Sequence, residues 1–248
     1  VIPIGPPIEL FGYKINLVVA DVNIGVLYVF ALTSLGVYGI TFAGWSSGSK
    51  YSLLGGIRSS AQMISYEVSM GFSIAGVLLM SQSLSPMKIV ESQYGWMWNA
   101  IIQPIGFITF VVSAFAETNR LPFDLPEAEP ELVGGYHTEY SSFKFAGFFL
   151  AEYANMIIAS GMIVTLYLGG WQVPYIDKLG LSTTITTIIQ VAAFLFKMGA
   201  ILFFFIWVRW SIPRFRYDQL MNLGWKVMFP LALANLIWVA LLIMIFNF

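Results

Sequence analysis

The chain contains six long apolar runs, and their length restricts what it can fold into. They cover approximately residues 22–43, 53–80, 100–116, 145–168, 184–208 and 227–247 of the 248. A helix needs about 20 predominantly apolar residues to cross the hydrocarbon core of a bilayer. The only other spanning structure is a closed barrel, and these runs lack the alternation over about ten residues that is typical of barrel strands. The sequence therefore predicts an all-α, polytopic transmembrane protein with about six spanning helices, in a single membrane domain over residues 1–248.

Composition supports this fold class and limits the chemistry. Hydrophobic residues make up 58% of the chain and charged residues only 10%, which is typical of integral membrane proteins. There is no cysteine, and His137 is the one histidine. These counts exclude thiolate-bound iron–sulfur clusters, cysteine zinc sites and a bis-histidine haem on this chain. We therefore expect no metal or redox cofactor here, and we expect His137, in a loop, to be a solvated or a capping residue.

Acidic residues concentrate in one loop, residues 117–144, between the third and fourth apolar runs. Of the 13 acidic residues in the chain, six lie there: Glu117, Asp124, Glu127, Glu129, Glu131 and Glu139. Carboxylates are costly to desolvate and repel one another, so such a cluster tends to hold protons with raised and coupled pKa values. A merely solvated acidic loop is the alternative. The apolar, proline-rich setting argues against it, because proline limits the freedom of the loop to extend into water.

Three ionisable residues fall inside the predicted spans: Glu67, Glu152 and Lys197. A charge near the bilayer centre costs about 3 kcal/mol or more, so such residues usually face a protein interior or a water path. Phe145, Phe149 and Glu152 follow the spacing i, i+4, i+7, which predicts an aromatic track leading to a buried carboxylate on one helix face. The structural alternative is that each of the three charges is paired and locks helices together.

The distribution of lysine and arginine predicts the orientation. Eight of the 12 fall in loops on one side of the predicted spans, three fall on the other side, and Lys197 lies within a span. The positive-inside rule places the eight in the cytoplasm. The acidic loop 117–144 and the basic loop 209–226 are therefore both predicted to be cytoplasmic.

Four segments resemble one known family. They are AETNRLPFDLPEAEPELVGGYHTEY (Ala116–Tyr140), GWSSGSKYSLLGGIRSSAQMISYEV (Gly44–Val68), LAEYANM (Leu150–Met156) and RWSIPRFRYDQLMNLGWK (Arg209–Lys226). Over essentially the whole chain they resemble the H subunit of the bacterial proton-pumping NADH:quinone oxidoreductase, respiratory complex I. The resemblance implies a multi-pass protein of the bacterial inner membrane with about eight helices, whose cytoplasmic loops form the floor and wall of a quinone chamber.

The resemblance also implies partners and residue roles. Quinone is the implied substrate, and FMN and iron–sulfur clusters are implied on partner subunits. Peripheral iron–sulfur subunits at the cytoplasmic loops, antiporter-like membrane subunits and lipids are the implied partners, with no nucleic acid. The residues implied in proton coupling are Glu67, Glu117, Arg120, Asp124, Glu127, Glu129, Glu131, Glu139, Glu152 and Lys197. Those implied along the quinone passage are Phe145 and Phe149, with Arg209, Arg214 and Arg216 near its entrance.

One departure from the family and two alternatives remain. The family has about two further helices before Val22, whereas the segment Val1–Asp21 resembles the external loop ahead of the family's third helix. We therefore expect the N-terminal part of the family either to be missing from this chain or to be a separate piece.

The alternative functions are the homologous membrane subunit of a ferredoxin- or hydrogenase-linked ion-pumping complex and a secondary transporter. The second class often shows inverted repeats, which are not found in this sequence.

Overall fold

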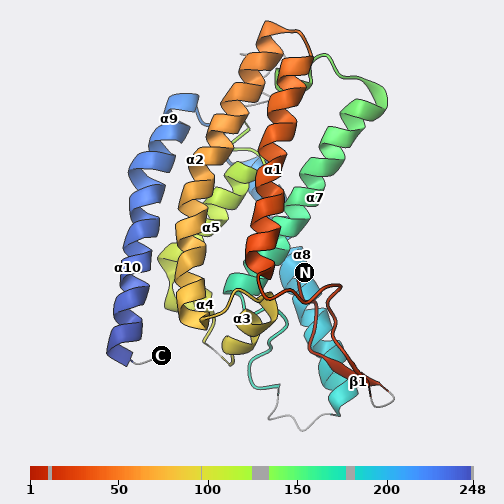
Figure 1. Ribbon diagram of the computed structural model, residues 1–248, viewed down its shortest axis with the longest axis vertical. Coiled ribbons are helices and arrows are strands. Elements are labelled where there is room, and N and C mark those ends of the chain that lie inside the picture. The colour runs from red at the N-terminus through yellow and green to blue at the C-terminus, as the bar shows by residue number, and fades with distance from the viewer. Residues whose placement is uncertain (11–12, 96, 125–133, 177–181, 247–248) are drawn as a thin grey trace.

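Long helices dominate the structure (Figure 1), which is a computed structural model that describes residues 1–10, 13–95, 97–124, 134–176 and 182–246. The long helices are α1 (Gly25–Ser46), α2 (Lys50–Ser81), α7 (Ser142–Tyr167), α8 (Thr183–Ser211) and α10 (Phe229–Phe246). The shorter segments are α3 (Pro86–Ser92), α4 (Asn99–Ile102), α5 (Pro104–Glu117), η1 (Gly135–His137), α9 (Tyr217–Asn222) and the π-helical turn η3 (Leu223–Met228). The strands β1 (Ile8–Leu10) and β2 (Tyr13–Ile15) form an antiparallel hairpin.

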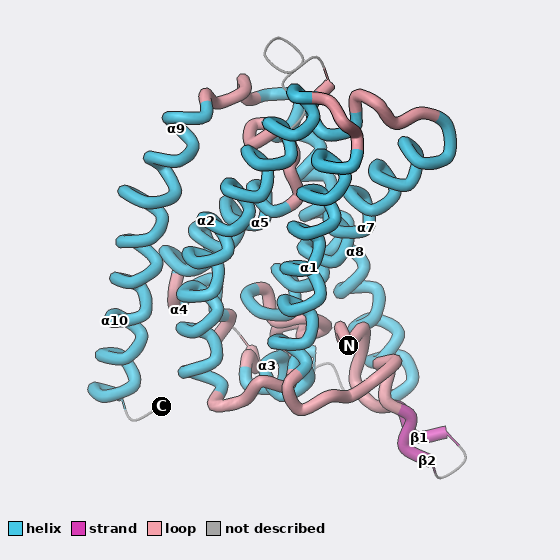
Figure 2. The backbone as a smooth tube through the Cα atoms, turned by 45° about the horizontal axis from the view of Figure 1, so that its top comes forward, coloured by secondary structure: helices cyan, strands magenta, loops and turns pink. Residues whose placement is uncertain are grey.

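Within the described part of the chain, five helices are long and apolar enough to cross a membrane. They are α1, α2, α7, α8 and the continuous run Tyr217–Ile245, which joins α9, η3 and most of α10. The remaining predicted run is broken into α4 and α5, and α5 has only 14 residues. The small β-hairpin lies outside the helix bundle, near the beginning of α8 (Figure 2). The predicted fold class is confirmed: this is an all-α polytopic membrane protein.

The break between α4 and α5 has a local cause. Pro104 has no N–H group, and its ring pushes the preceding residue out of the helical region. Gln103 accordingly has φ −130° and ψ 67°. Proline fits the first turn of a helix, and Pro104 begins α5 there. In that turn, the N–H of Gly106 has no partner within the helix and donates to Asn235 Oδ1 of α10 at 3.0 Å.

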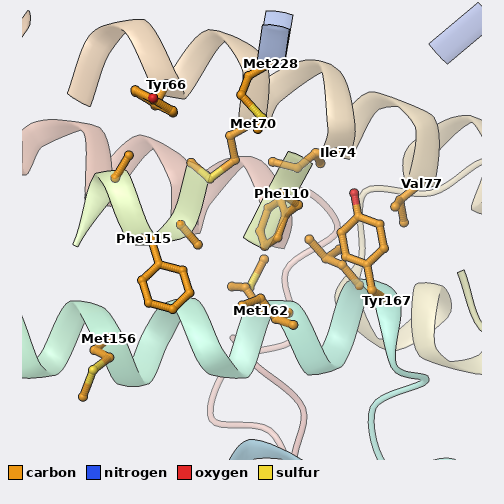
Figure 3. Close-up of a cluster of buried hydrophobic side chains, with 14 of the residues drawn as sticks. Tyr66, Met70, Ile74, Val77, Phe110, Phe115, Met156, Met162, Tyr167 and Met228 are labelled. Carbon is orange, nitrogen blue, oxygen red and sulfur yellow. The ribbon is translucent and has the colours of Figure 1, made fainter. Parts of the chain in front are cut away.

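The hydrophobic core lies where α2, α5 and α7 meet. Figure 3 shows Tyr66 and Met70 of α2, Phe110 of α5 and Tyr167 of α7 pointing into one cluster, with Met228 added from η3. All five side chains are at most 7% exposed. The core therefore fixes the three helices that carry Glu67, Glu117 and Glu152 relative to one another.

Helices α1 and α2 approach closely at a pair of glycines. A Cβ atom on Gly44 would lie 2.8 Å from the carbonyl oxygen of Ser52 and 3.3 Å from the Cα of Gly56. Small residues at helix contacts in membranes allow such approach. It brings the polar side chains of α1 within reach of α2.

Candidate functional site

Three carboxylates from three helices lie around one polar region. Glu67 comes from α2, Glu117 from the end of α5 and Glu152 from α7. Ser34 of α1 donates a hydrogen bond to Glu67 Oε1. Thr33, the preceding residue, contacts the Glu117 carboxyl group through its hydroxyl, and Glu117 also lies within electrostatic range of Glu67. Two adjacent hydroxyl groups of α1 thus connect carboxylates that are far apart in the sequence.

A cavity of about 240 Å³ lies between these helices and contains two of the carboxylates in its wall. Its lining residues are Gly36, Gly39, Ile40, Met63, Glu117, Thr118, Asn119, Tyr136, Phe148, Ala151, Glu152 and Asn155. The α7 positions 148, 151, 152 and 155 follow i, i+3, i+4 and i+7, which is one face of a helix. The cavity therefore combines a largely apolar wall with a few polar groups, two of which are carboxylates.

An ion pair joins the loop after α5 to α7. Arg120 Nε lies 2.8 Å from Glu152 Oε1, and the two side chains are 6% and 15% exposed. The N–H is not aligned for a hydrogen bond, so charge attraction holds the pair. The Arg120 guanidinium also lies 4.4 Å from the centre of the Tyr153 ring. Arg209 of α8 lies beside the hydroxyl of the same ring. Two arginines therefore contact Tyr153, and one of them, Arg120, pairs with Glu152 of the cavity wall.

A second ion pair fixes the same loop from its other side. Arg214 Nη2 lies 3.0 Å from Asp124 Oδ2. Between the two pairs, Phe123 packs its ring against Tyr66 and Phe215, at centroid distances of 5.5 and 5.6 Å. The segment 120–124 is thus attached to α2, to α7 and to the segment before α9. Its position is defined by charge and by packing together.

Aromatic rings gather where α7 meets η1. The rings of Phe145 and Phe149 are 4.8 Å apart, and both pack on His137, at 5.2 and 6.2 Å. His137 is partly buried and its Nε2 is fully buried, so of its two predicted roles, a solvated or a capping residue, the solvated one is wrong. The aromatic residue of α7 that lines the cavity is Phe148, one turn before Glu152. Phe145 and Phe149 form the adjoining aromatic cluster instead.

Lys197 is held by backbone carbonyl groups. Its Nζ donates hydrogen bonds to the carbonyl oxygens of Leu168, Gly170 and Gln172 at 2.8, 3.1 and 2.8 Å, which occupies all three N–H donors of an ammonium group. It also lies 4.3 Å from the centre of the Trp98 ring, a favourable place for a cation. A positive charge at a helix C-terminus is stabilising. These contacts favour a capping role for Lys197 at the end of α7 over its predicted role in proton coupling, which stays a prediction.

The remaining predicted site residues lie farther from the cavity or outside the described structure. Glu127, Glu129 and Glu131 lie outside the described residues. Glu139 is exposed in the loop before α7, and Arg216 is exposed at the start of α9. In the described ranges, no group of three or more histidine or acidic residues could hold a metal ion.

Several residues of the site were not selected from the sequence. Thr33 and Ser34 are a polar pair within an apolar span, which is a detectable signal. Phe148 and Asn155 could be found by extending the helical period from Glu152 by four residues back and three residues forward.

Comparison with known proteins identifies the family. The profile of the NADH dehydrogenase family matches residues 1–240. The chain is 52% identical over 246 residues to the NADH-quinone oxidoreductase H subunit 1 of Cytophaga hutchinsonii, covering 99% of this chain and 72% of that protein. It is 53% identical over 249 residues to the NADH-quinone oxidoreductase H subunit of Salinibacter ruber, covering 96% and 72%. It is 53% identical over 248 residues to NADH-quinone oxidoreductase subunit 8 of Rhodothermus marinus, covering 96% and 73%. The chain therefore belongs to the family of NADH-quinone oxidoreductase H subunits.

Proposed function

We propose that this chain forms part of the quinone-binding chamber of a proton-pumping NADH-quinone oxidoreductase and couples quinone reduction to proton translocation. The observation that carries the proposal is the convergence of Glu67, Glu117 and Glu152 on one polar region beside the cavity. Isolated carboxylates at membrane depth are costly, so three that converge beside a cavity favour a functional site.

The cavity suits a quinone head group. Ligand sites usually combine an apolar, aromatic wall with a small number of polar groups that fix the orientation of the ligand. Phe148 and Tyr136 supply flat rings, and the amides of Asn119 and Asn155 can donate to a quinone carbonyl oxygen.

The ion pair of Arg120 and Glu152 gives a route from quinone chemistry to proton movement. Two electrons from an iron–sulfur cluster on a partner subunit and two protons convert the quinone to its hydroquinone. Negative charge that develops in the cavity competes with Glu152 for Arg120, and in a setting of low dielectric this competition is strong. Glu152 then takes up a proton. Glu117, Thr33, Ser34 and Glu67 extend the response, because coupled carboxylates titrate as a group.

The surroundings of the chain follow from the same proposal. Loops 117–144 and 209–226 lie on the cytoplasmic side of the bacterial inner membrane, as the lysine and arginine distribution predicts. Peripheral subunits that carry FMN and iron–sulfur clusters contact these loops, and antiporter-like subunits lie beside the membrane helices. The chain itself is one membrane domain and contributes no redox centre.

Photolabelling of the intact complex tests the quinone site. A quinone with an azide on its ring should label residues that line the cavity, among them those of α7, and excess unlabelled quinone should prevent it. Ala151→Phe, which places a ring in the cavity, should abolish this labelling. Ala146→Phe is the matched control, because Ala146 is on α7 but does not line the cavity. Labelling of this chain only at residues that do not line the cavity, or equal labelling of both variants, would remove the quinone from this cavity.

A further inference from the structure

A row of buried polar side chains without formal charge lies between α2 and α5. Helix α2 contributes Gln62, Ser69 and Ser73, and α5 contributes Thr109 and Ser113. Each of the five is at most 1% exposed. The row is separate from the carboxylates discussed above, and the proposed function does not use it.

The antiparallel arrangement of the two helices sets these residues opposite one another in layers. The hydroxyls of Ser73 and Thr109 are 2.6 Å apart. Gln62 Nε2 donates to the carbonyl oxygen of Ala116 at 2.9 Å, farther along the same interface. Ser69 lies one turn before Ser73 on α2, and Ser113 lies one turn after Thr109 on α5. Because the helices are antiparallel, Ser69 is expected opposite Ser113.

Several polar atoms of the row have no hydrogen-bond partner among the described residues. They are the hydroxyls of Ser69 and Ser113, together with Gln62 Oε1 and, at the end of the row, Gln103 Nε2. A buried polar group without a partner is destabilising, and such groups in native proteins are usually paired with protein or with ordered water. By contrast, Ser73 donates to the carbonyl of Ser69 at 3.1 Å, as hydroxyls in membrane helices commonly do.

The row has defined ends. At one end, Gln62 donates to Asn119 Oδ1 at 3.4 Å, and Asn119 lines the cavity. At the other end, Asn235 Nδ2 donates to Gln103 Oε1 at 3.3 Å, at the break between α4 and α5. Gly76 leaves room there, since a Cβ atom on it would lie 2.7 Å from Gln103 Oε1. The row therefore runs from the cavity to the helix break.

We infer that the facing hydroxyls of Ser69 and Ser113 bind water between α2 and α5, and that this hydrated row is a second proton route, one that contains no carboxylate. Successive layers at Ser69 and Ser73 are about 6 Å apart along the helix, and those at Gln62 and Ser69 are about 10 Å apart. Both spacings exceed a direct hydrogen bond, so bridging water is required. A hydroxyl can accept one hydrogen bond and donate another. The hydroxyls of Ser73 and Thr109 also donate to carbonyls of their own helices, so the route requires each O–H to turn from its carbonyl toward water or toward the other hydroxyl. A proton then passes along the row without leaving a charge on any side chain.

The water site is tested without reference to function. A map of the intact complex at a resolution that shows ordered water should place density within hydrogen-bond distance of both Ser69 Oγ and Ser113 Oγ. The inference is overturned if both hydroxyls instead donate to carbonyls of their own helices and no density lies between them. This measurement remains informative if the proposed quinone function fails.

The proton route rests on the proposed function, and pumping measurements test it. In proteoliposomes that contain the complex, the double variant Ser69→Ala/Ser113→Ala should lose part of the proton-to-electron ratio and keep its rate of quinone reduction, because neither residue lines the cavity. Ser160→Ala is the matched control. Ser160 is an equally buried hydroxyl on α7, but it donates to the Met156 carbonyl at 2.7 Å, and its loss should leave the ratio unchanged.

Two further outcomes separate the possible failures. Ser113→Thr keeps a hydroxyl at the same position and should retain the ratio, which distinguishes loss of the route from altered packing. A double variant that assembles and pumps at the wild-type ratio would overturn the route even if the water is present. A wild-type complex that reduces quinone without moving protons would instead contradict the proposed function.

Discussion

Replacing Lys197 with methionine should destabilise the protein and leave the proton-to-electron ratio intact. Methionine keeps most of the length of the side chain but cannot donate a hydrogen bond. The carbonyl groups of Leu168, Gly170 and Gln172 would then lose their shared donor at the end of α7. Buried carbonyls without a partner are destabilising.

The expected loss can be worked from the contacts. A hydrogen bond from a charged donor contributes about 1.5–3 kcal/mol, and Lys197 makes three of them. Its contact with Trp98 adds about 1 kcal/mol. Removing this partly buried ammonium also removes its desolvation penalty, which is of the order of several kcal/mol. The net destabilisation should therefore be about 2–4 kcal/mol, with no unpaired charge left behind because the partners of Lys197 are neutral carbonyl groups and a ring.

Thermal unfolding of the purified complex, followed through this subunit, measures the destabilisation. Lys88→Met is the control, because Lys88 is exposed and its replacement should change stability by no more than about 0.5 kcal/mol. If Lys197→Met unfolds like the wild type but pumps fewer protons per electron, Lys197 is a proton carrier and the capping role is refuted.

Two other predictions concern the quinone site and the acidic loop. Phe148→Ala should raise the apparent KM for short-chain quinones about tenfold, which corresponds to the loss of about 1.4 kcal/mol of ring contact, and Phe149→Ala should have the smaller effect because Phe149 packs on His137. NADH oxidation by an artificial acceptor that bypasses quinone should be unchanged, and a parallel fall of both activities would indicate defective assembly. Infrared difference spectra of quinone reduction should show carboxyl bands that disappear when Glu127, Glu129 and Glu131 are all replaced by Gln. Unchanged bands would remove this triplet from the coupling.

The positions of the membrane helices could be predicted from the sequence, but the interruption of one of them was not predicted. The length of the apolar runs identifies membrane helices because a bilayer admits few other structures. The run over residues 100–116 was predicted as one span, although it contains Pro104, and the structure divides it there. The rule that proline interrupts a helix was available from the sequence. The cap that Asn235 supplies to Gly106 was not, because it depends on how α10 packs.

In the candidate site, too, some residues could be selected from the sequence, but their contacts could not. Glu67 and Glu152 could be selected because a carboxylate in an apolar span stands out. The partners of these carboxylates could not be predicted, because they depend on how segments far apart in the sequence pack together. Ser34 binds Glu67, and Arg120 pairs with Glu152. Phe145, Phe148 and Phe149 all fit a helical period with Glu152, so the sequence could not distinguish among them, and Phe145 and Phe149 were selected. The structure distinguishes them, because Phe145 packs on His137 of η1 whereas Phe148 lines the cavity.

The most direct test of the central claim is the proton-to-electron ratio of the complex with Glu67→Gln, measured in proteoliposomes. Glutamine keeps the volume of the side chain and can still accept the hydrogen bond of Ser34, but it cannot carry the charge or the proton. The account predicts a lower ratio in a complex that assembles normally. A variant that assembles and pumps at the wild-type ratio would show that Glu67 is structural and would contradict the account.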